Sequence, residues 1–213
     1  MFKILAAAAS AAVFAVGAAA QAPPSISRAS LAKTARFTIT QTFAPTGGAK
    51  STQVMHVEIK GGQARLEMNN PQVGAVTYLA NPRGVFLYMP TAKIAQKQSL
   101  PEGASVEGFL RRAFGQINRQ LRTAQKVGTA TVSGQPTDVY KDARSGTQIY
   151  IGRNPGFRLP VKVTAKNAGG TRTLLVSNIK TNIALADARF AVPPGVRVIE
   201  ASGGAGVPGG GGF

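Results

Sequence analysis

The sequence predicts a mainly β protein of the α+β class, built on one antiparallel sheet of about eleven strands. Short runs that alternate apolar and polar residues recur between residues 36 and 179. Turn-forming groups rich in Gly, Pro and Asn separate these runs, and a single helical pattern interrupts them after the sixth run. The expected strands are 36–43, 51–60, 63–69, 76–80, 85–89, 94–100, 127–133, 137–141, 147–152, 161–166 and 171–179.

Residues 1–22 have the pattern of a secretory signal peptide. Lys3 precedes an apolar run over residues 4–20, and small residues follow it, as a cleavage site requires. An N-terminal membrane anchor is the alternative, because the run is near the lower length limit of a spanning helix. We therefore expect a periplasmic or secreted protein with a single domain at 23–200 and a disordered Gly-rich tail at 201–213.

The chain carries 25 Lys and Arg against 8 Asp and Glu, a net charge of +17 at pH 7. This charge favours anionic partners, and an anionic membrane surface is a candidate that an exported protein meets. A nucleic-acid partner is not expected, because a secretory signal argues against it and no basic-aromatic alternation is present. A scattered charge that only keeps the protein soluble is the alternative. The chain has no cysteine, so neither a disulfide nor a lipid-modified cysteine is expected.

The first elements of the domain are a short helix and a strand. Residues 27–35 are expected to be helical, since Ile26, Leu31 and Ala35 are spaced as on one helical face. In the strand at 36–43, Phe37 and its apolar neighbours alternate with threonines, which is typical of a half-buried strand.

The clearest local prediction is a hairpin of the runs 51–60 and 63–69, joined by the tight turn Gly61-Gly62. A two-residue turn fixes the register, and a shift by one residue would move every side chain to the other face. Apolar residues then collect on one face and opposite charges on the other, which we expect to face solvent. The predicted pairs are Met55 with Met68, Val57 with Leu66, Ile59 with Ala64, His56 with Glu67, and Glu58 with Arg65.

This register gives His56, the sole histidine, a structural role as the exposed partner of Glu67. No metal site is expected, because one histidine, no cysteine and eight scattered carboxylates do not form the clusters that metals need. No catalytic residue is predicted, since no Gly-x-Ser-x-Gly elbow accompanies a Ser, His and Asp set. The sequence therefore predicts a protein that is not an enzyme and has no cofactor.

Residues 106–122 form the strongest helical pattern. Apolar residues three and four apart build one stripe, and the reverse face is basic. Such a helix can lie on a membrane, cover a lipid-binding sheet or pack on the core. Gly108 and Gly115 each weaken it by roughly 1 kcal/mol relative to alanine. The apolar stripe consists of Val106, Phe109, Leu110, Ala113, Phe114, Ile117 and Leu121.

Three closing segments carry a resemblance to a known family: LPVKV at 159–163, SNIKTNIALADARF at 177–190 and VPPGVRVI at 192–199. The expected order of elements adds to it: a signal peptide, a short helix, six strands, an amphipathic helix and five strands. Together they resemble the LolA-like periplasmic carriers of outer-membrane lipoproteins, over residues 27–199. The resemblance implies an unclosed, strongly curved antiparallel β-barrel with an apolar concave side covered by helices.

The resemblance also implies a carrier or sensor that shields lipid or lipoprotein acyl chains in this concave cavity, with the amphipathic helix as a lid. We expect such a protein to be a monomer. The alternative is an exported cell-envelope protein of the same fold with a filled core, which uses its basic surface for protein or anionic-polymer contacts. The implied acyl-binding residues are Phe37, Ile39, Met55, Val57, Leu66, Met68, Leu87, Met89, Phe109, Leu110, Phe114 and Ile117.

Overall fold

A computed structural model of the chain describes residues 25–71, 74–98 and 106–200. The predicted signal peptide at 1–22 and the predicted Gly-rich tail at 201–213 lie outside these residues. So do the side chain of Phe109 and the last two residues of the sixth predicted strand. Within the described residues, no helix has the length and the apolar character needed to cross a membrane.

The described chain folds into twelve strands, one α-helix and two short 3-10 helices. In chain order they are η1 (Arg28–Ser30), β1 (Thr34–Pro45), β2 (Ser51–Lys60), β3 (Gln63–Asn70), β4 (Gly74–Asn81), β5 (Gly84–Met89), β6 (Ile94–Gln98), α1 (Val106–Leu121), β7 (Ala124–Val132), β8 (Gln135–Asp142), β9 (Gln148–Gly152), β10 (Pro160–Asn167), β11 (Gly170–Thr181), η2 (Asp187–Phe190) and β12 (Arg197–Glu200).

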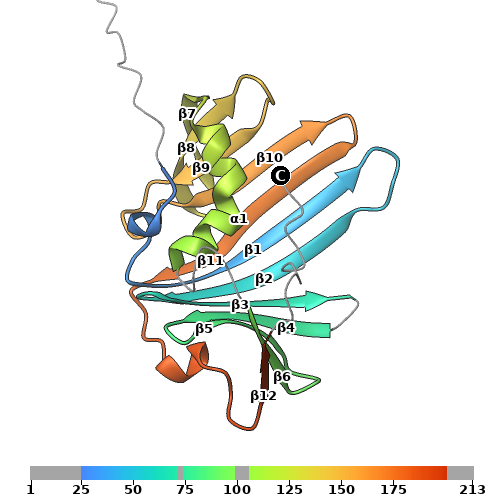
Figure 1. The fold of residues 1–213 in the computed structure, drawn as a ribbon. Helices are drawn as coiled ribbons and strands as arrows, with labels where there is room; N and C mark the ends of the chain where they lie inside the picture. The colour runs from blue at the N-terminus through green and yellow to red at the C-terminus, as the bar shows by residue number, and fades with distance from the viewer. Residues whose placement is uncertain (1–24, 72–73, 99–105, 201–213) are drawn as a thin grey trace, which may run out of the picture.

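All twelve strands belong to one sheet, in the order β12-β6-β5-β4-β3-β2-β1-β11-β10-β9-β8-β7. The first strand, β1, lies in the middle because it pairs with both β2 and β11. The sheet is strongly curved, and within the described chain its edge strands β12 and β7 do not pair with each other (Figure 1). The predicted fold class, a mainly β protein with an unclosed barrel and one inserted helix, is confirmed.

The structure adds one strand to the eleven that the sequence predicts. β12 runs parallel to β6, with Arg197 paired to Ile94 and Glu200 to Lys97. Four residues are too few for an alternating pattern to stand out in the sequence. A parallel partner far away in the chain also leaves no hairpin turn to recognise. The sheet is therefore antiparallel except at this edge.

The helix expected at residues 27–35 shrinks to the three residues of η1, and β1 begins soon after it. The main chain bonds instead to the loop that precedes β10. Ala32 N donates to Gly156 O at 2.9 Å, and Arg158 N donates to Ser30 O at 2.7 Å. These long-range bonds use donors and acceptors that a longer helix would need for itself.

The predicted hairpin register is confirmed for all the pairs that the Gly61-Gly62 turn implies. Alternate residues of β2 and β3 therefore lie on opposite faces of the sheet, as in a regular antiparallel ladder. The same alternation continues through β4 and β5, so each face can be followed residue by residue across the sheet.

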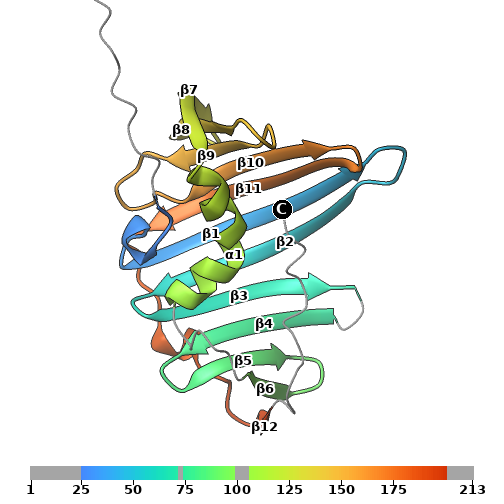
Figure 2. The same cartoon turned by 45° about the horizontal axis from the view of Figure 1, so that its top comes forward.

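The main apolar core lies on the concave face, and α1 crosses this face inside the curve (Figures 1 and 2). In this core, the rings of Phe37 and Phe157 meet edge to face with 5.1 Å between their centroids. The predicted helix is confirmed to within one residue at its C-terminal end. Its buried side chains include Leu110, Phe114, Ile117 and Leu121.

Candidate functional site

The predicted acyl-binding residues other than Phe109, whose side chain lies outside the described residues, gather on the concave face and on the side of α1 that packs against it. The register places the six that come from β1, β2 and β3 in one block. Leu87 of β5 joins this block through Tyr78 of β4, which pairs with both Leu66 and Leu87. One continuous apolar surface therefore extends across five neighbouring strands.

Side chains of α1 and of the sheet are buried against one another. Eight of the predicted residues are at most 8% exposed, and those from the helix and from the strands form one cluster. Met68, Leu87 and Met89 are only half-buried, and they extend the apolar face beyond the most buried part. The eight buried residues are Phe37, Ile39, Met55, Val57, Leu66, Leu110, Phe114 and Ile117.

Polar contacts on and directly after α1 tie the helix to its surroundings. The Asn118 side chain accepts a hydrogen bond from Ile26 N at 3.1 Å. Directly after the helix, Thr123 Oγ1 donates to Asp142 Oδ1 at 3.3 Å, at the end of β8. A hydrogen bond from the Ser145 hydroxyl at 2.7 Å lowers the pKa of Asp142, with further bonds from the Arg144 main chain and from Thr123. Asp142 therefore joins the end of α1 to the turn between β8 and β9.

The convex face of the sheet has a cover of its own, the strap, formed by residues 182–196 between β11 and β12. Phe190 and Leu185 of the strap are 1% and 6% exposed. Lys60 Nζ donates to Leu185 O at 2.7 Å, and Asn81 Nδ2 donates to Phe190 O at 2.7 Å. The strap is therefore held to β2 and to the end of β4.

Glu58 lies under the strap, where the sequence predicts a solvent-facing side chain. Its side chain is only 6% exposed and accepts from Arg36 Nε at 2.7 Å and from Arg189 Nε at 2.6 Å. The hydrogen bond to Glu58 raises the pKa of Arg189. The predicted cross-strand neighbour Arg65 instead forms an ion pair with Glu67 and donates to Arg189 O at 2.8 Å. The strap therefore covers Glu58, which would be exposed in the hairpin alone.

His56 remains exposed on this convex face. It stands opposite Glu67 in the register, as predicted. Its Nδ1, however, lies 3.3 Å from Thr38 Oγ1 on β1, and Glu67 forms its ion pair with Arg65. In the described part of the chain, no three residues among His, Cys, Asp and Glu are grouped so that they could hold a metal ion.

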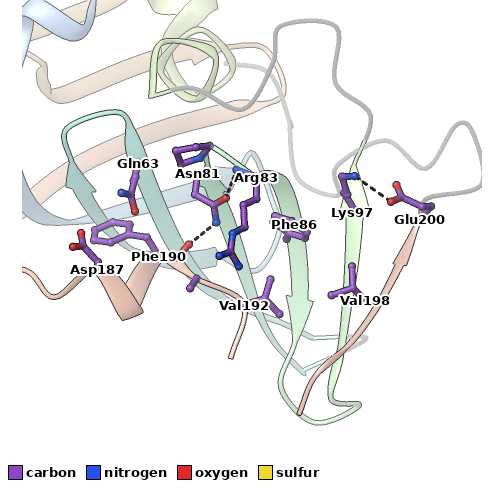
Figure 3. A pocket seen from close by; sticks show the side chains of 12 residues that line it. Gln63, Asn81, Arg83, Phe86, Lys97, Asp187, Phe190, Val192, Val198 and Glu200 are labelled. Atoms are coloured by element: carbon purple, nitrogen blue, oxygen red, sulfur yellow. Dashed lines mark hydrogen bonds and ion pairs between the residues drawn. The ribbon is translucent and has the colours of Figure 1, made fainter. Parts of the chain in front are cut away.

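Between the strap and the sheet edge lies an open groove of about 560 Å³ that sequence reasoning missed (Figure 3). Its walls come from the turn between β4 and β5, from the strap, from β6 and from the edge strand β12. The sequence marks the turn and the strap only as structural motifs, and no local signal shows that they meet. The groove is lined by Gln63, Asn81, Pro82, Arg83, Phe86, Lys97, Asp187, Phe190, Ala191, Val192, Val198 and Glu200.

The fold and these two covered faces define an open, curved β-sheet protein with a helix inside the curve and a strap outside it. No family model matches the sequence, and no curated protein matches it. Solved structures with a similar fold exist. An uncharacterized conserved protein from Thermus thermophilus is 11% identical, with 80% of this chain and 92% of that chain covered and a TM-score of 0.50.

Two further structures have lower TM-scores. A LolA superfamily protein from Nitrosomonas europaea is 12% identical, with 75% of this chain and 90% of that chain covered and a TM-score of 0.39. LprF from Mycobacterium bovis is 11% identical, with coverages of 72% and 88% and a TM-score of 0.42. At these identities the similarity concerns the fold alone.

Proposed function

We propose that this protein binds acyl chains of lipids or lipoproteins on its concave face, as a non-catalytic carrier or sensor in the cell envelope. In this proposal α1 is a lid that exchanges places with the acyl chain. The sequence resemblance to LolA-like carriers and the apolar concave face support it. The alternative, a protein of the same fold whose concave face is only core, is decided by the experiment below.

The observation that carries the proposal is the half-buried apolar strip formed by Met68, Leu87 and Met89. Met68 pairs with buried Met55, and Leu87 is joined through Tyr78 to buried Leu66, so the strip continues directly into the surface beneath α1. An acyl chain that first lies on this strip can extend under the helix without crossing a polar barrier. Unbranched methionine side chains also adapt readily to a flexible ligand.

α1 has the properties of a movable cover. Its contact with the sheet is largely apolar, so an acyl chain can replace the helix side chains that face the sheet at little polar cost, and the Asn118 hydrogen bond to Ile26 is the contact that opening would break. A Cβ built at Gly115 would meet no atom within 4 Å, so packing does not demand glycine there. This glycine nevertheless lowers helix stability by about 1 kcal/mol relative to alanine.

The energetics suit reversible binding. Burying a methylene contributes about 0.8 kcal/mol, so a sixteen-carbon chain gains about 12 kcal/mol in gross terms. Displacing α1 exposes the apolar stripe of the helix, and this cost offsets much of the gain. The difference sets a modest net affinity, which a carrier needs in order to release its cargo.

Two measurements test the proposal. Native mass spectrometry of gently purified protein should show a co-purifying acyl species, and titration with a fluorescent fatty acid should show saturable uptake. The double variant Leu87→Gln, Met89→Gln should weaken uptake about tenfold, because polar amides replace half-buried apolar contacts. Val127→Gln, at a 58% exposed position on edge strand β7, is the matched control and should leave uptake unchanged.

A protein that carries no acyl species and takes up no fatty acid would refute the proposal and support the filled-core alternative. Leu66→Arg gives a second readout. If the concave face opens to ligand, this variant keeps its fold and loses uptake. If the face is permanent core, the 7% exposed site cannot hold a charge and the variant unfolds.

A further inference from the structure

The groove on the convex face is separate from the proposed acyl site, because the sheet itself lies between them. Phe86 and Lys97 pair across β5 and β6 and point to the convex side, whereas Val85 and Leu87 lie on the concave side. We propose that this groove binds a small amphiphilic anion, in which one carboxylate or phosphate group is attached to a short apolar body.

The charges of the groove favour an anionic group. Both carboxylates that line it already have cationic partners: Asp187 accepts from Lys60 at 2.7 Å, and Glu200 accepts from Lys97 at 3.1 Å. Arg83 also lines the groove, and among the described residues its guanidinium has no carboxylate partner. The groove therefore has one unneutralised cation, with a planar fork of donors that fits a carboxylate or phosphate.

The remaining surface of the groove favours an apolar body next to that anion. Phe86 is 6% exposed and forms part of the floor, while Val192 of the strap and Val198 of β12 stand at its sides. Val198 is 49% exposed, so its apolar side chain is accessible to a ligand in the groove. In Figure 3 the Arg83 side chain extends among these residues, so the cation and the apolar surface face the same space. A volume of about 560 Å³ lies in the range of small-ligand sites.

Hydrogen bonds of one buried side chain join two walls of the groove, and a preorganised site lowers the cost of binding. The Asn81 side chain has both ends engaged: its Nδ2 donates to Phe190 O at 2.7 Å, and its Oδ1 accepts from Arg83 N at 2.9 Å. This buried amide therefore fixes the strap and the arginine-bearing turn relative to each other. Gly84 in this turn has φ +137°, a backbone conformation that other L-residues rarely adopt, so glycine supports the shape of the turn.

The test uses octanoate and octyl phosphate as probes and neutral octanol as the control for the apolar body. Each is titrated into ¹⁵N-labelled protein, and amide shifts give the location and the affinity of binding. We expect one or both anions to shift amides of the 81–86 turn and of residues 191–200, with octanol binding at least tenfold more weakly. Arg83→Gln should lower the affinity for the anionic probe about tenfold. This is the effect of losing one charge-assisted contact of about 1.4 kcal/mol.

Arg144→Gln is the matched control. Like Arg83, Arg144 is an exposed arginine whose main-chain N–H donates a hydrogen bond to the side chain two residues earlier. Arg144 lies in the β8–β9 turn, away from the groove. This variant should leave the affinity unchanged. Which probe binds identifies a carboxylate or a phosphate as the preferred head group. The proposal is overturned if neither anion shifts the groove amides, if octanol binds as tightly, or if Arg83→Gln and Arg144→Gln behave alike. Shifts confined to Met68, Leu87 and Met89 would support the acyl site and reject the groove.

Discussion

Replacing Glu58 by glutamine tests whether the strap is held by a buried charge cluster. In the structure, the carboxylate is 6% exposed and accepts short hydrogen bonds from Arg36 and Arg189, at 2.7 and 2.6 Å. Glutamine keeps the shape, but it removes the charge and leaves its amide NH2 facing one of the two arginines. One of the two bonds is therefore lost outright, and the other is weakened because only its arginine donor remains charged.

The expected loss of stability follows from these contacts. A hydrogen bond to a charged group contributes about 1.5–3 kcal/mol where it is buried. The two arginine side chains are 45% and 44% exposed, so water replaces part of the hydrogen bonding that they lose after the substitution. We therefore expect Glu58→Gln to lower the free energy of unfolding by about 2 kcal/mol, less than the roughly 3–5 kcal/mol seen when a fully buried pair is broken.

Urea unfolding followed by circular dichroism measures this change, with the slope of the transition unaltered. Glu67→Gln is the matched control, because Glu67 is a 40% exposed carboxylate paired with Arg65 on the same face. It should cost less than about 1 kcal/mol. Limited proteolysis should also cut the 182–196 strap faster in Glu58→Gln. A free energy of unfolding of Glu58→Gln within about 0.5 kcal/mol of the wild type, or equal to that of Glu67→Gln, would show that the charge cluster does not hold the strap.

Three further substitutions test other parts of the fold. Gly115→Ala should raise the free energy of unfolding by up to about 1 kcal/mol, because the site in α1 has room for a Cβ; a decrease in urea unfolding would contradict this. Gly170→Ala should destabilise by on the order of 3 kcal/mol or fail to fold, because φ is +138° and a Cβ would overlap the Ala44 carbonyl oxygen; near-normal thermal unfolding would contradict it. Asp142→Asn should be less stable than wild type near neutral pH. Since hydrogen bonds from Ser145 and its neighbours lower the pKa of Asp142 below 3.8, the carboxylate contributes stability above that pH and loses it as pH falls through the folded-state pKa. The stability difference should therefore shrink below about pH 3.8, and a constant difference across pH would exclude this role.

Local rules in the sequence account for much of the fold. The Gly61-Gly62 turn and the alternation around it predict the register of β2 and β3, because both act between residues close in the chain. The three-and-four spacing of apolar residues likewise predicts α1. The same patterns bring the predicted acyl-binding residues to one face, since alternation in each strand decides which face a side chain occupies.

What covers each face was decided by the tertiary structure. Glu58 has the sequence pattern of an exposed strand residue, yet it is buried by Arg189, which lies 131 positions away. β12 pairs in parallel with β6, which lies about a hundred residues earlier in the chain, and no turn sequence indicates this pairing. The groove depends on both contacts, because its walls come from the strap and from β12. Periodicity fixes the direction of a side chain from its own strand, whereas burial depends on distant segments that carry no local signal. The sequence alone thus determined the strands, the helix and the apolar concave face, and only the folded chain created the convex groove.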